Sequence, residues 1–213
     1  MTINVVNYTK VLKKNTVLNN VNYTFNSGKI YGLSGRNGCG KTMLLRAIAG
    51  LILPTEGYVS IDGKIIGKDI EFPESVGLII ENMNMPNEYT AFKNLQLLAK
   101  IKNTANEQEI KNALIKVGLD PNDKKSVRKF SLGMKQKLNI AQAIMEKPQI
   151  LLLDEPTNAL DFESVKCVHQ LLSEFKKNDA LVIIASHNKE DLDGICDVII
   201  NIDEGEIVNE KVC

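Results

Sequence analysis

The sequence predicts an α/β fold with a parallel central sheet, an antiparallel β portion near the N-terminus and an inserted helical portion. Two observations predict it: short aliphatic and β-branched runs alternate with segments of helical apolar spacing, and one long stretch shows helical spacing throughout. We expect one domain over residues 1–213, because no linker divides the chain. Its core is expected at about residues 1–85 and 147–213, with a helical subdomain at about 86–146.

The N-terminal part of the chain is expected to contain strands joined by tight turns. Three runs with strand composition come first, and they are Ile3–Tyr8, Val17–Phe25 and Lys29–Leu33. Asp62-Gly63 is a pair favoured in two-residue hairpin turns, and it separates the strand candidates Tyr58–Ile61 and Lys64–Ile66. The short apolar run Val76–Ile80 predicts a further buried strand.

The middle of the chain switches to helical spacing after Thr90, which is a good N-cap residue. One apolar face contains Phe92, Leu95, Leu98, Ala99 and Ile101, and a second contains Ile110, Leu114 and Val117. A further helix is expected at Met134–Met145, because Pro148 follows it.

The last third of the chain alternates strands and helices again. The continuous apolar run Ile150–Leu153 is typical of a central parallel strand. A helix is expected at Phe162–Lys177. Three further strands are expected at Leu181–Ala185, Val198–Ile202 and Glu206–Val208.

The composition is that of an ordinary globular protein, and it disfavours several classes. Lys+Arg and Asp+Glu both number 26, so bulk charge gives no support to nucleic-acid binding. The longest apolar runs are far shorter than the roughly 20 residues of a membrane-spanning helix, and residues 1–10 lack a signal-peptide core. The four scattered cysteines fit neither a disulfide framework nor a zinc site. We expect a cytoplasmic protein whose membrane role requires a partner.

The strongest single feature is a glycine-rich segment between a strand and a helix. It matches G-x-x-x-x-G-K-[ST] and consists of Gly35, Arg36, Asn37, Gly38, Cys39, Gly40, Lys41 and Thr42. Its backbone N–H groups can surround phosphate oxygens, and the following helix presents its positive end to them. We expect Lys41 to reach the β- and γ-phosphates and the Thr42 hydroxyl to coordinate Mg²⁺. The sequence thus predicts a P-loop that binds ATP and Mg²⁺.

The alternative is a glycine-rich turn that matches this motif by chance. From average composition, the four fixed positions match somewhere in roughly one chain in a hundred of this length. The strand–loop–helix context makes the chance match rarer still, so we prefer the nucleotide-binding interpretation.

An apolar strand further along the chain ends in two carboxylates, Asp154 and Glu155. Ligands of open α/β sheets bind at the carboxyl ends of the strands. We expect Asp154 to hold Mg²⁺, directly or through water, and Glu155 to polarise the water that attacks the γ-phosphate. The alternative is that both residues only cap the strand and begin a turn at Pro156, but the P-loop upstream favours the catalytic role.

The order of several short motifs resembles that of ABC ATPases, over about residues 3–208. After the P-loop, Phe130–Gln136 resembles the ABC signature, Asp154–Pro156 the acidic strand end, Asn158–Asp161 the D-loop and Ala185–His187 the switch-histidine segment. Each of the minor motifs is weak alone, whereas the ordered set is highly specific. The resemblance implies a P-loop NTPase fold and an ATPase whose catalytic set is Lys41, Glu155 and His187.

The resemblance also implies a dimer formed around ATP. In this family two chains pack head to tail, and the signature serine and glycine of one chain, here Ser131 and Gly133, close on the γ-phosphate held by the other. Asp161 of the D-loop is expected to belong to the same nucleotide site. Ser131 is also a natural N-cap for the helix that follows it. One chain has one P-loop and one signature, so two complete sites need a second ATPase subunit, for which a second copy of this chain is our first choice.

Some positions depart from the usual pattern of the family. Glu81 stands where the family usually has Gln, and it resembles the E-loop of ABC proteins in lantibiotic self-protection. We expect Glu81 to offer an oxygen to Mg²⁺ or to water, and the alternative is a solvated strand end. Leu132 and Met134 also depart from the common signature, and the resulting string resembles the bacitracin-resistance and lantibiotic-immunity exporters.

Two further positions bear on nucleotide binding. Cys39 lies inside the P-loop, and we predict that its alkylation blocks nucleotide binding. The family's adenine-stacking aromatic is expected near Lys10–Lys13, where this chain has Val11 or Leu12, and Tyr8 is out of register.

We therefore interpret the chain as an ATPase subunit that drives a separate integral-membrane permease from the inner face of the cell membrane, with export of a peptide or drug. A second hypothesis is a soluble ABC ATPase that acts on ribosomes or DNA. The paired ATPase units, the long coiled coil and the basic patch of such proteins are missing from the sequence. A third hypothesis is a regulatory module that binds ATP without hydrolysing it, and the retained Lys41, Asp154, Glu155 and His187 argue against it.

Overall fold

The structure is a computed structural model that describes residues 1–80 and 85–213, and the described residues form two β-sheets flanked by helices. The antiparallel sheet has the order β2-β1-β4-β5. Its strands are β1 (Thr2–Leu12), β2 (Asn15–Asn26), β4 (Glu56–Ile61) and β5 (Lys64–Ile65). The expected antiparallel β portion near the N-terminus is therefore confirmed.

The second sheet is the central one, with the order β10-β9-β3-β8-β7-β6. Its strands are β3 (Ile30–Ser34), β6 (Val76–Ile79), β7 (Ile150–Asp154), β8 (Leu181–Ser186), β9 (Val198–Asp203) and β10 (Glu206–Val212). Neighbouring strands pair in parallel except at the edge, where β10 runs antiparallel to β9. The predicted α/β fold with a parallel central sheet is confirmed.

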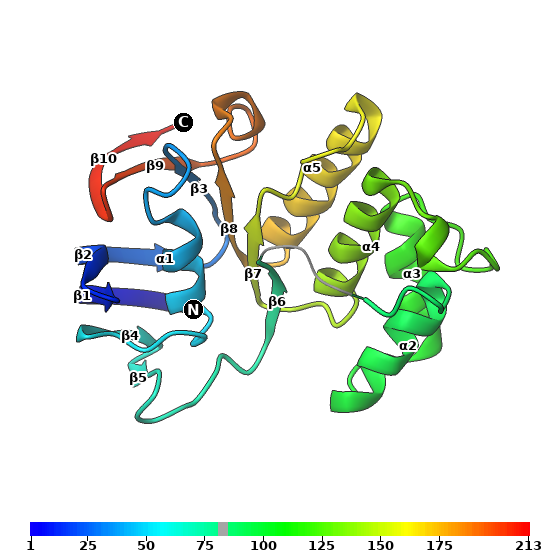
Figure 1. Cartoon of the computed structure of the whole chain (residues 1–213), viewed down its shortest axis with the longest axis horizontal. Helices are drawn as coiled ribbons and strands as arrows, with labels where there is room; N and C mark the ends of the chain where they lie inside the picture. Colours follow the sequence, from blue (N-terminus) through cyan, green and yellow to red (C-terminus); the bar gives the residue numbers. More distant parts are fainter. Residues whose placement is uncertain (81–84) are drawn as a thin grey trace.

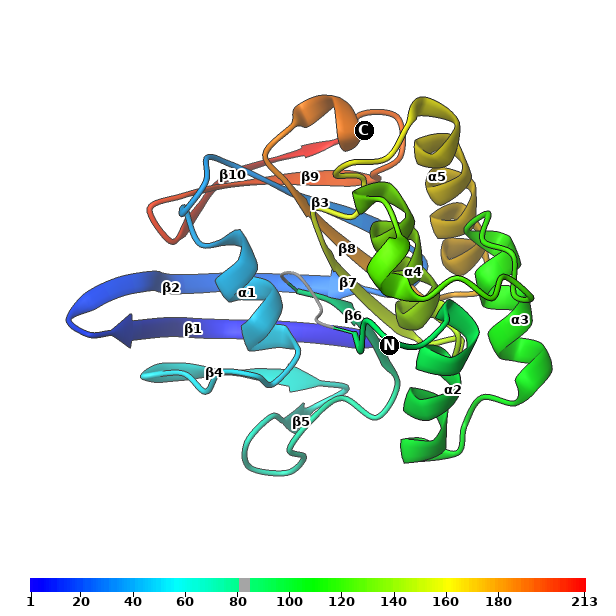
Figure 2. The ribbon, with the colours of Figure 1, turned by 45° about the vertical axis from the view of Figure 1, so that its right-hand side comes forward.

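The helices lie on both faces of the central sheet. They are α1 (Lys41–Ile48), α2 (Ala91–Lys102), α3 (Glu107–Lys116), α4 (Leu132–Ile144) and α5 (Phe162–Lys177), with short 3₁₀ turns η1 (Val127–Lys129) and η2 (Lys189–Asp191). Figure 1 shows α2, α3 and α4 together on the side away from the antiparallel sheet. In Figure 2 α1 lies near β1 and β2, and it contacts β7, β8 and β2. None of the helices in residues 1–80 and 85–213 is both long and apolar enough to cross a membrane.

Alternation along the central strands divides the core into two parts. Leu151 and Leu153 of β7 pack with the residues of α2 to α5. Leu152 of the same strand packs with α1 and the antiparallel sheet. Because both faces are covered, β7 and β8 are apolar along almost their whole length, as expected for parallel strands. The buried strands thus give a rigid base to the loops at their ends.

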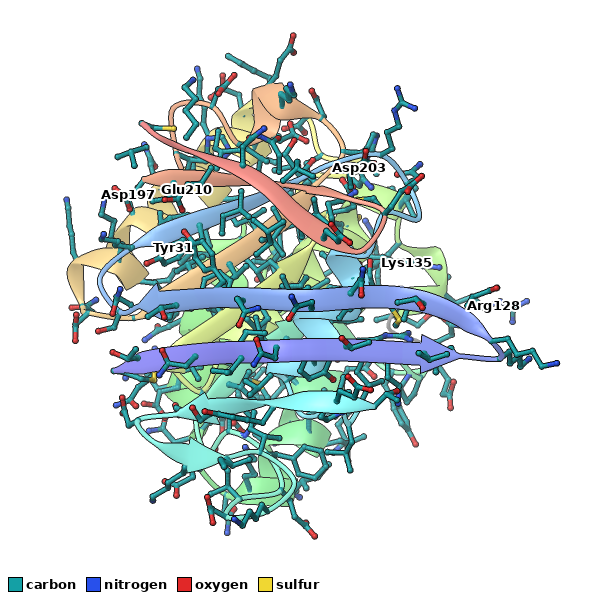
Figure 3. All side chains as sticks on the ribbon, turned by 90° about the vertical axis from the view of Figure 1, so that its left-hand side faces the viewer. Tyr31, Arg128, Lys135, Asp197, Asp203 and Glu210 are labelled. Atoms are coloured by element: carbon teal, nitrogen blue, oxygen red, sulfur yellow. The ribbon has the colours of Figure 1, made fainter. Side chains whose placement is uncertain are left out.

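Two turns of the antiparallel sheet show how local chemistry sets its hairpins. Asp62 and Gly63 both have positive φ (47° and 84°), as a two-residue hairpin turn requires, so this prediction is confirmed. β1 and β2 are longer than expected, because Lys13 and Lys14 also adopt positive φ (46° and 72°) and make a hairpin without glycine or asparagine. Figure 3 looks onto this sheet, where β10 lies beside β2 and the Tyr23 hydroxyl donates to Glu210 at 2.6 Å.

The helical segment after residue 90 differs in one respect from the expectation. Thr90 caps α2 as predicted, and its hydroxyl accepts from the backbone N–H of Lys93 at 3.2 Å. Ile101, however, is 79% exposed, so its place on the buried face was wrong. The helix ends immediately afterwards at Asn103 (φ 59°), and a new helix starts from the capping box of Asn106.

Candidate active site

The register of the central sheet brings the predicted motifs to one edge. Ser34, at the end of β3, pairs with Ser186 at the end of β8, and Asp154, at the end of β7, pairs with Ala185. The P-loop follows Ser34, and His187 follows Ser186. The carboxyl ends of three parallel strands therefore carry the P-loop, the acidic pair and the histidine side by side, as Figure 2 allows the reader to follow.

The P-loop is folded so that only glycine fits at two of its positions. Gly40 has a φ of 113° and precedes α1, which no side chain of the described residues caps. A Cβ on Gly35 would lie 2.3 Å from the carbonyl oxygen of Ile202. Because that oxygen belongs to the backbone and cannot easily move away, a residue larger than glycine does not fit there. The first N–H groups of α1 lack partners within the helix, and its first turn holds no acidic residue. This helix terminus is thus suited to an anion.

Lys41 lies within the P-loop and not on the outer surface. Its side chain is 6% exposed, and its Nζ donates to the carbonyl oxygens of Gly35 at 2.7 Å and Arg36 at 3.0 Å. Cys39 is also buried, with its Sγ 3.9 Å from the Lys41 Nζ. The ammonium group is thus held where the loop backbone turns, close to the unpaired amides of α1.

The next helical residue connects the P-loop to the acidic strand end. The Thr42 hydroxyl donates to Asp154 Oδ2 at 2.6 Å. This pair brings two hard oxygen atoms together from α1 and β7, although they are 112 residues apart in the chain. Hard oxygens are the ligands that Mg²⁺ prefers.

Glu155 is held by the loop that follows β8. Its Oε1 accepts from the backbone N–H of His187 at 2.9 Å and lies 2.6 Å from His187 Nδ1. Its Oε2 accepts from the Ser186 hydroxyl at 3.2 Å. A carboxylate has about four lone-pair sites, so with a proton on His187 Nδ1 both sites of Oε1 are filled, and Oε2 keeps one site for another donor. The two side chains are partly exposed, at 20% for Glu155 and 49% for His187, so water reaches them.

The backbone at Glu155 is in the left-handed region, which is costly for a residue with a side chain. Its φ is 47°, and its N–H donates to the carbonyl of Ala185 at 2.8 Å. Gln136 of α4 donates from Nε2 to the carbonyls of Glu155 at 3.2 Å and Pro156 at 2.9 Å. Neighbouring elements therefore stabilise a conformation that the chain would otherwise avoid. Gln136 was part of the signature string but was not chosen as a site residue.

The signature residues occupy the start of α4. Ser131 caps this helix as expected, accepting from the backbone N–H of Met134 at 3.2 Å. A Cβ on Gly133 would lie 2.8 Å from the carbonyl of Ala159, so a glycine lets α4 approach the loop after β7. Asp161 caps α5 by accepting from Ser164 N–H at 2.8 Å, and this hydrogen bond holds the pKa of its carboxyl below the usual value.

The predicted residues thus fall into two groups. Strand ends bring together the P-loop, Asp154, Glu155 and His187. Among the described residues, no hydrogen bond joins Ser131, Gly133 or Asp161 to residues 35–42. Glu81 lies outside the described residues.

Tyr8 is excluded as an adenine-stacking residue. Its side chain is buried, its hydroxyl donates to the carbonyl of Ile52 at 2.9 Å, and burial raises its pKa to about 12. Val11 and Leu12 are about 40% exposed, so they offer aliphatic surface in place of an aromatic ring.

The residues present fit a nucleotide triphosphate with Mg²⁺. The P-loop supplies amides and an ammonium group for phosphates, and Thr42 and Asp154 supply oxygen atoms for a hard cation. In the described part of the chain, no cluster of three or more His, Cys, Asp or Glu residues suits a metal held by protein alone. This donor set suits a cation that is shared between the protein and phosphate oxygens.

Comparison with known proteins identifies the family. Residues 18–158 match the family described as ABC transporter. The ABC transporter ATP-binding protein YybJ of Bacillus subtilis (strain 168) is 56% identical over 211 residues, which cover 99% of this chain and 97% of that protein. The bacitracin transport ATP-binding protein BcrA of Enterococcus faecalis is 39% identical, and the match covers 96% of this chain and 67% of BcrA. The lantibiotic transport ATP-binding protein SrtF of Streptococcus pyogenes is 35% identical, with 98% and 90% covered.

A solved structure agrees with these relatives. The dimeric structure of MJ0796, a bacterial ABC transporter cassette, matches with a TM-score of 0.89 at 25% identity, covering 99% of this chain and 98% of that one. The predicted family is confirmed by sequence and by fold. The chain belongs to the ABC transporter family, and its curated relatives are ATP-binding subunits of such transporters.

Proposed function

We propose that two copies of this chain close around two ATP molecules with Mg²⁺ and drive a separate membrane permease that exports a peptide antibiotic or related drug. One observation carries the proposal: a single chain places its P-loop, Asp154, Glu155 and His187 at one sheet edge, while Ser131 and Gly133 lie at the start of another helix. A second chain is the simplest source of the missing signature residues for each site.

Within this site we assign each residue a role that follows from its contacts. The P-loop amides and Lys41 bind the phosphates, and Thr42 with Asp154 holds the metal. Mg²⁺, when bound, would neutralise the negative charge that develops on the phosphate oxygens during phosphoryl transfer. Glu81 remains a proposed additional metal ligand. Ser131 and Gly133 of the second chain donate to the terminal phosphate, and Asp161 belongs to the same contact region.

Glu155 acts as the general base in this proposal. Water attacks the γ-phosphorus, the bond to the leaving ADP oxygen breaks, and the proton of the water passes to Glu155. Oε2 is the oxygen that accepts this proton, because Oε1 already accepts from His187 N–H and faces His187 Nδ1. His187 fixes the carboxylate with a proton on Nδ1, which leaves Nε2 free to contact the phosphate or the water.

The decisive experiment replaces Glu155 with Gln, which keeps the shape of the side chain and removes its basicity. We expect Glu155→Gln to lose about a hundredfold or more in turnover and to elute as a dimer with Mg·ATP during size-exclusion chromatography. Lys41→Ala is the matched control, because it should stay monomeric at the same nucleotide concentration. A Glu155→Gln protein that hydrolyses ATP at the wild-type rate, or that stays monomeric with ATP, would refute the proposed site.

The permease is proposed to dock where the helices meet the core. A cleft of about 400 Å³ lies between α1, β6 and α4, and it is lined by Arg46, Leu51, Ile52, Leu78, Ile80 and Gln142. Leu51 is 51% exposed, which makes it a candidate for contact with an apolar partner segment. The helical subdomain, proposed at about residues 86–146, would pass the closing motion to this partner from the inner face of the membrane.

Co-purification from membranes tests this partner. We expect Leu51→Glu to lose the permease and keep ATP-dependent dimerisation, whereas Ile115→Glu, at a similarly exposed position on α3, should keep both. Export is tested by the survival of cells exposed to bacitracin or a lantibiotic, with and without Glu155→Gln. Equal survival of the two strains against both compounds would contradict export of such peptides and leave the ATPase assignment standing.

A further inference from the structure

Asp191 contacts the catalytic region through two hydroxyl groups. Its Oδ2 accepts from the Thr157 hydroxyl at 3.0 Å and lies 3.3 Å from the Ser186 hydroxyl oxygen. Thr157 lies two residues after Glu155, and Ser186 directly precedes His187. One carboxylate oxygen therefore joins the loop after β7 to the loop after β8. Asp191 ends η2, and Figure 1 shows the segment that follows β8 as an orange coil.

These hydroxyl groups are well buried, so their hydrogen bonds matter. Ser186 is 0% exposed and Thr157 is 8% exposed. A buried hydroxyl that loses its partner carries a desolvation cost, and a neighbouring segment moves to relieve it. Among the described residues, Asp191 is the one acceptor to which the Thr157 hydroxyl donates.

Ser186 stands between the two carboxylates. Its hydroxyl lies 3.2 Å from Glu155 Oε2 and 3.3 Å from Asp191 Oδ2, and it accepts from the backbone N–H of Asn188 at 3.1 Å. A hydroxyl has one proton, so it donates fully to only one carboxylate at a time. Asp191 therefore competes with Glu155 for this proton, and Glu155 Oε2 is the oxygen that must stay open to water.

We propose that Asp191 is a positioning residue for ATP hydrolysis, which orients the Ser186 and Thr157 hydroxyls so that Glu155 and His187 keep their reactive arrangement. This inference rests on the proposed role of Glu155. Asp191 does not touch the nucleotide in this scheme, and it acts only through the two hydroxyls. The property that counts is an acceptor oxygen at the Oδ2 position, and not the negative charge.

A purely electrostatic role is the main competitor. The charge of Asp191 acts on His169 of α5, where it opposes the larger effect of burial, which lowers the histidine pKa. Asp191→Asn separates these roles, because it removes the charge but keeps an oxygen that both hydroxyls can reach. Asp191→Ala removes the charge and the acceptor together.

The test measures ATP turnover and KM of the full chain with Mg·ATP, together with thermal unfolding. We expect Asp191→Ala to lose about tenfold to a hundredfold in kcat, because small misplacement of a catalytic group has effects of this size, while KM stays within about twofold because the P-loop is untouched. Asp191→Asn should stay within about threefold of wild type. Asp193→Ala is the matched control, since Asp193 is exposed on the same segment and its side chain makes no hydrogen bond within the described residues.

A double-mutant cycle tests the route of the effect. If Asp191 acts through Thr157, Thr157→Val should lower kcat, and Asp191→Ala combined with Thr157→Val should be less impaired than the product of the single losses.

Three outcomes would overturn the inference alone: wild-type kcat in Asp191→Ala, equal losses in Asp191→Ala and Asp191→Asn, or a loss in Asp191→Ala matched by raised KM and a lower Tm. A wild-type chain that hydrolyses no ATP would instead overturn the proposed function, and this inference with it.

Discussion

Ser131 is expected to have two separable roles, one in its own chain and one in the partner chain. Within the chain it caps α4, with φ −63°, ψ 165° and its Oγ accepting from Met134 N–H at 3.2 Å. Replacing an N-cap Ser with Ala costs about 1 kcal/mol, whereas Gly costs roughly a few tenths of that. For a domain of this size, about 1 kcal/mol lowers the Tm by about 2–4 °C. The stability effects of the two variants should therefore differ clearly.

The ATPase activities of Ser131→Ala and Ser131→Gly should not follow this order of stability. If the Ser131 hydroxyl also donates to the terminal phosphate held by a second chain, Ala and Gly remove the donor equally, and each should cost about a hundredfold or more in turnover. Ser131→Asp should keep the helix cap and the wild-type Tm, but it places a carboxylate beside the phosphate and should also be inactive. The assays are thermal unfolding by circular dichroism and phosphate release at saturating Mg·ATP.

A second capped helix provides the control. Asn106 caps α3 in a capping box, and Asn106→Ala should lower the Tm as Ser131→Ala does without reducing turnover. If Ser131→Gly and Ser131→Asp both hydrolysed ATP at the wild-type rate, Ser131 would be a helix cap only, and the two-chain site would be wrong.

Three further predictions concern other parts of the site and the fold. Alkylation of Cys39 should block Mg·ATP binding, and bound nucleotide should slow the labelling, because its Sγ lies inside the P-loop; calorimetry of the labelled protein measures the loss. Burial favours a higher pKa for Asp197, but hydrogen bonds from Lys176 and a backbone N–H outweigh it, so the pKa is lowered. The resulting stabilisation is present above the unfolded pKa of about 3.9 and is lost as the pH falls through the lowered value, so Asp197→Asn should weaken the acid dependence of unfolding below about pH 4. Gln136→Ala should lower kcat by about tenfold with little change in KM, because it removes the hydrogen bonds that hold the left-handed backbone at Glu155. Steady-state kinetics tests this prediction.

The sequence predicted the structure correctly where the local chemistry allows few backbone conformations. The P-loop motif required glycine at Gly35 and Gly40. In the structure a Cβ on Gly35 would clash with the backbone of Ile202, and Gly40 has a positive φ. Asp62-Gly63 likewise specified its hairpin. The apolar runs of β7 and β8 were readable because strands covered on both faces need no polar alternation.

Other features depend on tertiary contacts and left no local pattern. The Lys13-Lys14 turn uses residues that seldom adopt positive φ, so the strand length was underestimated. Ile101 fitted the helical period but lies where α2 ends, beyond the surface that the neighbouring helices cover. Asp191 was missed because a single acidic residue in a loop has no distinguishing spacing; its contacts with Thr157 and Ser186 exist only after β7 and β8 pair.

Titration calorimetry with Mg·ATP tests the central claim most directly, because it measures phosphate binding by the P-loop without requiring turnover. We expect the wild-type chain to bind, and Lys41→Ala to bind about tenfold to a hundredfold more weakly, as the loss of a charged hydrogen-bond donor predicts. Lys68→Ala, which removes an exposed lysine from another part of the chain, should bind like the wild type. Equal affinities of the wild type and a folded Lys41→Ala variant would contradict the proposed site.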